Sequence, residues 1–145
     1  MKRKIIDLLS IAMSCMMLFA MLPSASAVAL RSSDRFGQIT VEAQATGSGA
    51  VTFEFDINAT HTMKELGASQ GVIYEQQSSG MYKSVKTYTR NSTSGLIATN
   101  TAAAYGNVTY GGTSGKKYYA TFTLYAKDSD NTSETVYKST SVVTA

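Results

Sequence analysis

The sequence contains no tryptophan, one cysteine, one proline and one histidine. A single thiol and a single imidazole supply too few ligands for a zinc enzyme, so that class of protein is excluded. A Ser-His-acid arrangement would have to use His61, and no Gly-x-Ser-x-Gly motif accompanies that residue. These absences predict a protein without catalytic activity and without a cofactor.

The first 27 residues follow the pattern of a secretory signal peptide. Residues 2–4 are positively charged, residues 8–22 are mostly apolar, and residues 25–27 are small. The apolar run is shorter than the roughly 20 residues that cross a bilayer as a helix. We therefore expect cleavage after Ala27 and secretion into the extracellular medium. An uncleaved membrane anchor is the alternative.

Removal of residues 1–27 takes away the only cysteine and the only proline, Cys15 and Pro23. Ten of the 13 basic residues and nine of the 10 acidic residues remain, which leaves no basic stripe for nucleic-acid binding. Exported domains usually carry disulfides where the compartment oxidises thiols, so a cysteine-free domain indicates a Gram-positive bacterium. We expect a flexible N-terminal segment over residues 28–36 and a single domain over residues 37–145.

Two segments near the start of this domain alternate apolar and polar residues with the period of a β-strand. They cover residues 38–46 and 50–59, and Gly47-Ser48-Gly49 between them predicts a hairpin loop. That loop sets a register in which the apolar residues of both strands share one face. The predicted pairs are Ala45 with Val51, Ala43 with Phe53, Val41 with Phe55 and Ile39 with Ile57.

The rest of the domain is also predicted to form strands, apart from one helical turn over residues 63–67 that is capped by Thr62. The strands are expected over residues 70–76, 81–90, 96–99, 103–110, 118–127 and 134–144. About seven or eight short strands without a helical layer predict an all-β fold, a single antiparallel two-sheet sandwich. A small barrel is the alternative.

The segment from Gly115 to Ala126 has the sequence GKKYYATFTLYA. It resembles the penultimate strand of fibronectin type III and related immunoglobulin-like domains, in which a tyrosine opens the strand and alternate residues point inward. Tyr118 stands at the tyrosine-corner position of those domains. The resemblance implies an immunoglobulin-like sandwich in which the Tyr118 hydroxyl bonds to backbone upstream.

The cysteine-free domain behind the leader contains Gly67-Ala68-Ser69, Lys86-Thr87-Tyr88 and Thr93-Ser94-Gly95-Leu96. With these segments it resembles short exported clostridial proteins of unknown function over most of the mature chain. The resemblance implies a fold and a location, and it implies no activity.

The strongest group of chemically active side chains is formed by Glu42, Glu54 and Asp56. The predicted register places Glu42 directly across from Glu54, and Asp56 follows on the same outer face. Opposed like charges are unfavourable unless they are solvated or neutralised. The three residues therefore form either a solvated face or a paired-carboxylate site, for a cation or for a glycan-active or metal-dependent enzyme.

Residues 128–134 carry oxygen ligands at alternate positions, as calcium-binding loops do. Asp128, Asp130 and Glu134 are the candidate ligands. An ordinary hairpin loop has the same composition, because Asp and Asn also favour turns. Both interpretations are open at this point.

Tyrosine is the remaining functional signal, with nine residues in the chain. Alternation along residues 118–127 turns one set of side chains inward and leaves a Tyr/Thr face outward, formed by Tyr119, Thr121, Thr123 and Tyr125. The further candidates for this face are Tyr74, Tyr82, Tyr88 and Tyr137. Such a surface can stack on sugar rings or anchor a protein, and it can also simply stabilise a sheet through cross-strand pairs.

The sequence as a whole predicts a secreted, non-catalytic module that binds a glycan or a protein surface outside the cell. The alternative is a structural protein that pairs with copies of itself through exposed sheet edges. An enzyme that uses Glu42, Glu54 and Asp56 is the third hypothesis. None of the three predicts nucleic acid or, after cleavage, a membrane as partner.

Overall fold

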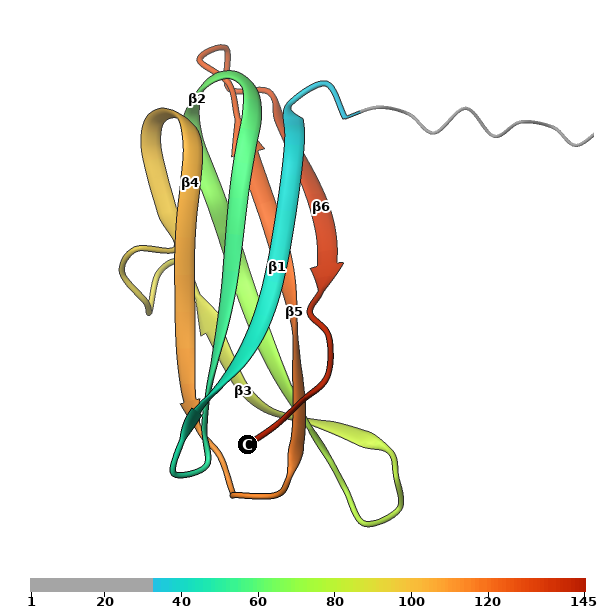
Figure 1. The fold of residues 1–145 in the computed structure, drawn as a ribbon. Helices are drawn as coiled ribbons and strands as arrows, with labels where there is room; N and C mark the ends of the chain where they lie inside the picture. Colours follow the sequence, from blue (N-terminus) through green and yellow to red (C-terminus); the bar gives the residue numbers. More distant parts are fainter. Residues whose placement is uncertain (1–32) are drawn as a thin grey trace, which may run out of the picture. The chain divides into compact units, whose positions relative to one another are not determined.

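The computed structural model describes residues 33–145, and the expected signal peptide and residues 28–32 lie outside that range. The described residues form one antiparallel sheet of seven strands (Figure 1). The strands are β1 Phe36–Gly47, β2 Ala50–Gln76, β3 Tyr82–Thr89, β4 Ile97–Gly111, β5 Lys117–Lys127, β6 Ser133–Ser139 and β7 Val143–Thr144. The prediction of an all-β fold is confirmed. Within the described residues, no helix has the length and apolar character needed to span a membrane.

β1 and β2 form the predicted hairpin. All four expected pairs are present, namely Ala45 with Val51, Ala43 with Phe53, Val41 with Phe55 and Ile39 with Ile57. The loop needs positive φ at three consecutive residues, with 93° at Gly47, 52° at Ser48 and 81° at Gly49. The alternation therefore predicts both the pairing and the buried face, since a slip by one residue would bury the acidic side chains.

β2 is 27 residues long and bends over the end of the sheet between Asn58 and Met63 (Figure 1). Its first part, residues 50–58, lies between β1 and residues 103–111 of β4, and we call these three segments the front half. Its second part, residues 63–76, pairs with β5, with β3 and with residues 97–101 of β4. We call these segments, together with β6, the back half. β4 bends opposite the same point, next to Asn100 with its φ of 51°. The sheet thus folds back on itself.

The prediction of a helical turn over residues 63–67 was wrong. The segment belongs to β2, where Glu65 pairs with both Thr99 and Lys127. Backbone pairing on both sides satisfies its N–H and C=O groups, which a single isolated turn would leave partly unpaired. Gly67 has a φ of 148°, and a Cβ there would lie 2.0 Å from the carbonyl oxygen of Leu96. Glycine therefore marks a close approach of strands at this point and not a helix end.

The core lies between the two halves of the folded sheet. The rings of Phe55 in the front half and Phe122 in the back half meet edge to face, with centroids 5.4 Å apart. The other large, fully buried side chains are those of Tyr118, Phe53, Ile57, Met63, Leu66, Ile73, Leu96, Leu124 and Val51. Each buried large apolar side chain contributes about 1.5–3 kcal/mol. This layer is the main source of stability in residues 33–145, which contain no cysteine.

Tyr118 is buried at the start of β5, and its hydroxyl makes the bond to upstream backbone that the fibronectin resemblance implies. The Thr113 N–H donates to the hydroxyl over 2.9 Å, and the hydroxyl donates in turn to Glu75 Oε2 over 2.9 Å. Lys116 pairs with Oε1 of Glu75 at 3.2 Å. The hydrogen bond from Tyr118 is the main cause that lowers the Glu75 pKa, and burial raises the Tyr118 pKa.

Residues 33–36, the described part of the 28–36 segment for which the sequence predicts flexibility, make contacts with the rest of the domain. The Ser33 hydroxyl donates to Glu134 Oε2 over 2.9 Å and accepts from the Phe36 N–H over 2.7 Å. Arg35 Nε lies 2.8 Å from Asp128 Oδ2. Residues 33–36 are therefore held on the loop that joins β5 to β6.

Candidate functional site

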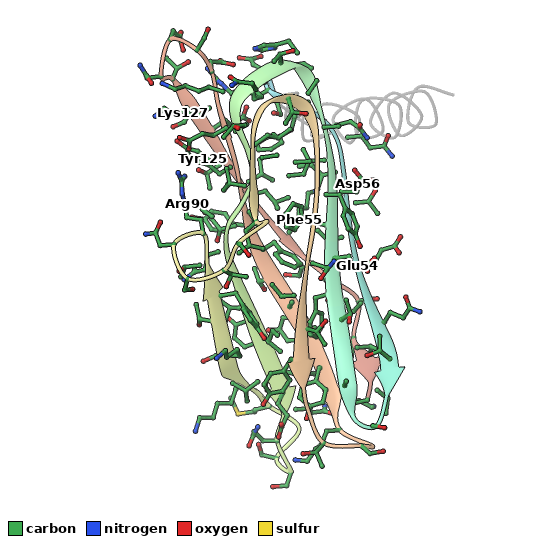
Figure 2. The ribbon with its side chains drawn as sticks, turned by 90° about the vertical axis from the view of Figure 1, so that its left-hand side faces the viewer. Glu54, Phe55, Asp56, Arg90, Tyr125 and Lys127 are labelled. Carbon is green, nitrogen blue, oxygen red and sulfur yellow. The ribbon has the colours of Figure 1, made fainter. Side chains whose placement is uncertain are left out.

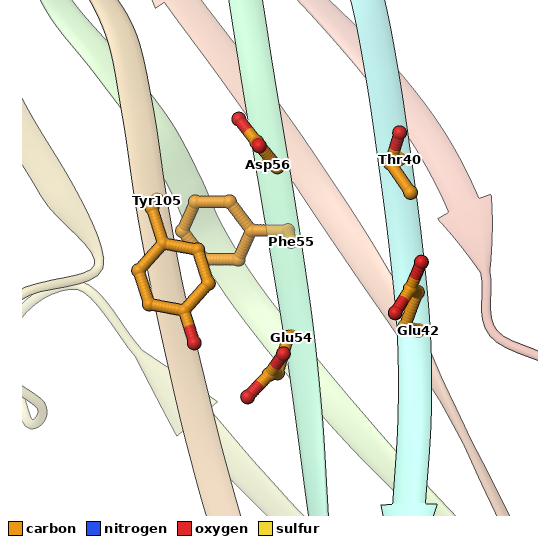
Figure 3. Close-up of a pocket in the computed structure, with 6 residues that line it drawn as sticks. All are labelled: Thr40, Glu42, Glu54, Phe55, Asp56 and Tyr105. Atoms are coloured by element: carbon orange, nitrogen blue, oxygen red, sulfur yellow. The ribbon is translucent and has the colours of Figure 1, made fainter.

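The three acidic residues singled out in the sequence lie together on the outer side of the front half. Glu42 on β1 is directly opposite Glu54 on β2, as predicted, and Asp56 follows two residues along β2. Tyr105 of β4 lies opposite Asp56 and is 58% exposed. Figure 3 shows how these side chains lie on the neighbouring strands. They border a depression of about 330 Å³. The depression is lined by Thr40, Glu42, Glu54, Phe55, Asp56 and Tyr105.

The acidic depression carries negative charge that no ion pair of residues 33–145 neutralises. The three ion pairs that Lys and Arg form in this part of the chain, and the contact of His61 with Asp128, use other carboxylates, those of Glu65, Glu75 and Asp128. Nowhere in the same residues are three Asp, Glu, His or Cys side chains grouped so that they could hold a metal ion together. The depression therefore offers negative potential beside an exposed tyrosine ring, on a surface open to water.

The loop over residues 128–134 uses its carboxylates to hold other parts of the protein. Asp128 pairs with Arg35, and Glu134 accepts the hydrogen bond from the N-terminal segment described above. Asp130 accepts hydrogen bonds from the hydroxyl and the N–H of Thr132, which lower its pKa. Asp128 and Asp130 both accept from the Thr132 hydroxyl, over 3.4 and 2.7 Å, and the three carboxylates of this loop are not grouped so that they could hold a metal ion together. This geometry favours an ordinary hairpin loop over a calcium site.

His61 links the bend of β2 to the same loop. Its Nε2 lies 2.8 Å from Asp128 Oδ1, and its Nδ1 lies 3.0 Å from the Thr60 hydroxyl. The order of hydroxyl, imidazole and carboxylate is that of a catalytic triad, but the Thr60 hydroxyl donates its proton to the Asp34 carbonyl over 2.7 Å. A hydroxyl bonded in this way is not activated as a nucleophile, so we assign the link a structural role. Sequence reasoning missed the link because His61 and Asp128 are 67 residues apart.

The outward face expected for β5 is present on the outer side of the back half. Buried residues alternate along this strand with half-buried ones, and the half-buried set includes Tyr119, Thr121, Thr123 and Tyr125. Tyr74 of β2 stacks on Tyr119, with ring centroids 4.8 Å apart and planes 8° apart. Tyr82 of β3 meets the Tyr119 ring edge to face at 4.9 Å. We call Tyr74, Tyr82 and Tyr119 the tyrosine cluster.

At the other end of β5, a charged pair covers Tyr125. The Arg90 guanidinium lies 5.3 Å from the centroid of the Tyr125 ring, and Arg90 Nη2 lies 2.8 Å from Glu65 Oε2. Figure 2 shows Arg90, Tyr125 and Lys127 on the same side of the ribbon. Sequence reasoning missed Arg90 and Glu65, because their approach depends on the pairing of β2 with β3 and β5. Alternation within one strand carries no signal for it.

Three of the four further tyrosines join the outward face. Tyr74 and Tyr82 do so through the tyrosine cluster, and Tyr137 lies opposite Thr123 with an exposed fraction of 71%. Tyr88 does not join, because its ring packs against the core and its hydroxyl donates to the Thr109 carbonyl over 2.7 Å. Its pairing with Gly71 turns it to the inner side, where burial raises its pKa.

The sequence matches no protein-family model, and no curated protein matches it. The two outer surfaces described above are therefore the basis for assigning a function.

Proposed function

We propose that this protein is a small, non-catalytic binding module that acts outside the cell and contacts its partner through the Tyr/Thr face of the back half. The observation that carries the proposal is the tyrosine cluster, in which the rings of Tyr74 and Tyr82, from two other strands, both contact Tyr119 on an outward surface. Tyrosine supplies a large, rigid contact with a polar end, and it is enriched at protein interfaces for this reason. Tyr137 extends the same face onto β6.

The arrangement of the rings supports a protein partner more than a glycan. A sugar stacks on the free flat side of an aromatic ring, whereas one flat side of Tyr119 is covered by Tyr74 and the Tyr125 ring faces Arg90. The ring edges and hydroxyl groups that remain suit a polar protein surface. Thr121 and Thr123 add hydrogen-bonding groups on stiff, β-branched side chains.

We also propose that the folded sheet is a two-sheet sandwich of the immunoglobulin or fibronectin type III kind. The contact of Phe55 with Phe122 across the core and the bond from Thr113 to Tyr118 support this assignment. β2 and β4 would then be the corner strands that pass between two packed sheets.

Secretion from a Gram-positive cell is proposed from the signal-peptide pattern of residues 1–27 and from the lack of cysteine after Cys15. N-terminal sequencing of the protein recovered from culture medium tests it. We expect the first residue to be Val28. An intact N-terminus on cell-associated protein would refute secretion.

The binding role is tested by comparing the wild-type protein with the double variant Tyr119→Ala/Tyr125→Ala. The immobilised protein is exposed to the proteins of the culture supernatant and, separately, to a glycan array. We expect it to retain a specific protein, and we expect the double variant to bind that protein at least about tenfold more weakly. Tyr105→Ala is the matched control, because it removes an exposed tyrosine from the opposite outer side.

Equal binding by wild type and the double variant, with both folded by circular dichroism, would remove the Tyr/Thr face from the proposal. Binding to the glycan array alone would replace the protein partner by a carbohydrate. Loss of binding in Tyr105→Ala alone would move the site to the acidic depression.

A further inference from the structure

We propose that β4 is a pairing edge, along which a second copy of this chain adds its own β4 and extends the front half across two molecules. This contact is separate from the Tyr/Thr face, which lies on the back half. Along residues 103–111, β4 pairs with β2 on one side and has no neighbouring strand on the other among the described strands. A strand in this position presents backbone groups that a further strand can bind.

Hydrogen bonds show which backbone groups of β4 point toward the open side. The Gly112 N–H bonds to Gly49 on the β2 side, whereas the Thr109 carbonyl accepts from the Tyr88 hydroxyl on the open side. The N–H and C=O of a residue in an antiparallel ladder point to the same side, and successive residues alternate. Tyr105 and Asn107 therefore direct their N–H and C=O groups away from β2.

The free stretch of this edge has defined ends. Ala103 directs its N–H and C=O to the Thr101 hydroxyl, at 3.2 and 2.8 Å. Tyr88 occupies the Thr109 carbonyl at the other end. The carbonyl oxygen of Gly95 would lie 3.1 Å from a Cβ at Gly106, on the core side of the strand where the Phe55 ring also lies. The backbone groups that remain available belong to Tyr105 and Asn107, one residue on either side of Gly106.

A two-fold axis matches this arrangement. Two identical strands related by such an axis run antiparallel and use the same surface on both copies. With the axis at Gly106, Tyr105 of each copy lies opposite Asn107 of the other, and both residues of each pair exchange N–H to C=O bonds. The register therefore uses the free groups of both strands.

Charge favours β4 over the other open edges. β3 carries Lys83, Lys86 and a register shift after Ile73, and β6 is only seven residues long with Glu134 and Lys138. Charged side chains, bulges and shortness are the features that keep sheet edges apart.

The β4 edge has none of these features. Residues 103–111 contain no charged residue, no proline and no register shift. An antiparallel pair of β1 strands, in contrast, would bring Glu42 of both copies close together.

Repulsion between the acidic depressions of the two copies does not oppose the pairing of their β4 strands. Glu54 and Asp56 lie on β2, one strand further from the axis than β4. Two copies of β4 would separate the two β2 strands by three strand spacings, roughly 14 Å. This distance exceeds the screening length of about 8 Å at physiological ionic strength, so the two acidic groups repel each other weakly.

Sedimentation velocity of the purified protein, from micromolar to near-millimolar concentration, tests the pairing. A single strand pair buries less area than a standard interface, so we expect a monomer–dimer equilibrium of micromolar or weaker affinity. Asn107→Lys should raise the dimer dissociation constant by roughly tenfold or more, because it places two ammonium groups beside the axis. Gln44→Lys adds the same charge to the β1 edge and should leave the equilibrium unchanged. A monomer at every concentration, or equal weakening by both variants, would overturn the proposal.

Cysteine pairs test the register independently of affinity. In a Cys15→Ser background, Tyr105→Cys/Asn107→Cys should form a covalent dimer on mild oxidation. The Cα atoms of a hydrogen-bonded antiparallel pair are about 5.5 Å apart, within the disulfide range. Either single cysteine should cross-link much more slowly, and so should the β1 pair Thr40→Cys/Glu42→Cys. Equal cross-linking in all four variants, or none in the β4 pair, would overturn the register. Neither result depends on the Tyr/Thr face.

Discussion

Among single residues, Tyr118 shows how a polar group is accommodated in this core. Its hydroxyl accepts one hydrogen bond from Thr113 and donates another to Glu75, so that no hydrogen-bonding group at this position is buried without a partner. A buried donor or acceptor that loses its partner costs about 1–3 kcal/mol. The stability of the β5 start therefore depends on this one oxygen atom.

Tyr118→Phe should lower the free energy of unfolding by about 1–3 kcal/mol, because the Thr113 N–H and the Glu75 carboxylate both lose a partner. Urea denaturation followed by circular dichroism measures the change. Tyr137→Phe is the matched control, since that ring is 71% exposed and should change stability little. Equal stability of the two variants would show that the Tyr118 hydroxyl contributes nothing.

Glu75 gives the stability a defined dependence on pH. Its pKa in the folded protein is held below the ordinary value of 4.5, first by the Tyr118 hydrogen bond and then by Lys116. The fold thus favours the ionised carboxylate. Its contribution is complete above pH 4.5 and is lost as the pH falls through the folded pKa. The stability difference between wild type and Glu75→Gln should shrink over this acidic range, as measured by denaturation at a series of pH values. A difference that grows on acidification would contradict the assignment.

At the scale of strands, alternation predicts the structure where a short loop fixes the partner. The β1–β2 register and the Glu42–Glu54 pair follow from the sequence because Gly47-Ser48-Gly49 leaves one way to close the hairpin. The outward set along β5 follows from period two alone. These successes depend only on neighbours in the chain.

Strand pairs that are distant in sequence could not be predicted in this way. Met63 and Leu66 are both fully buried and are three residues apart, a spacing that indicates a helix although both belong to β2. The tyrosine cluster depends on registers that shift between Ala68 and Gln70 and again after Ile73. After each shift, residues that would have pointed to one side of the sheet point to the other. The alternation of residues along one strand does not reveal where such a shift occurs.

Gly67→Ala tests the close approach of β2 and β4. The added Cβ would lie 2.0 Å from the Leu96 carbonyl oxygen, at a φ of 148° that side chains rarely adopt. We expect the free energy of unfolding to fall by about 2 kcal/mol or more in thermal or urea denaturation. Gly111→Ala is the matched control, because a Cβ there meets nothing within 4 Å. Similar stability of both variants would show that the strands can move apart without cost.

At the scale of the whole described unit, residues at the two ends of β5 hold the two ends of the described range, residues 33–145. Just after the end of β5, the Arg35–Asp128 pair and the hydrogen bond from Ser33 to Glu134 hold residues 33–36. At its start, β7 pairs with Lys117 and Tyr118, and the Ala145 N–H donates to the Lys116 carbonyl over 2.9 Å. A cysteine-free domain thereby gains two non-covalent fastenings at opposite ends of one strand.

Arg35→Ala should release residues 33–36 while the core stays intact. Because the pair is near the surface, with side chains 19% and 16% exposed, the global free energy of unfolding should change by less than about 1 kcal/mol. Hydrogen exchange should accelerate at residues 33–36 and in the β5–β6 loop, and it should stay slow in β2 and β5. Unchanged exchange at residues 33–36 would show that the Arg35 side chain does not hold them, and that the hydrogen bonds of Ser33 and Thr60 are sufficient.

β2, like β4, belongs to both halves of the sheet, and it pairs with β1, β3, β4 and β5. A protease that cut its exposed bend at residues 59–62 would therefore release no self-sufficient fragment, because each piece would keep an uncovered layer of apolar side chains. If the chain leaves the cell with its N-terminus first, its early segments would also lack their packing partners until the later segments have crossed the membrane. Its first hairpin would stay uncovered until the segment around Phe122 had followed, so under the proposed secretion the domain would close as one unit outside the membrane.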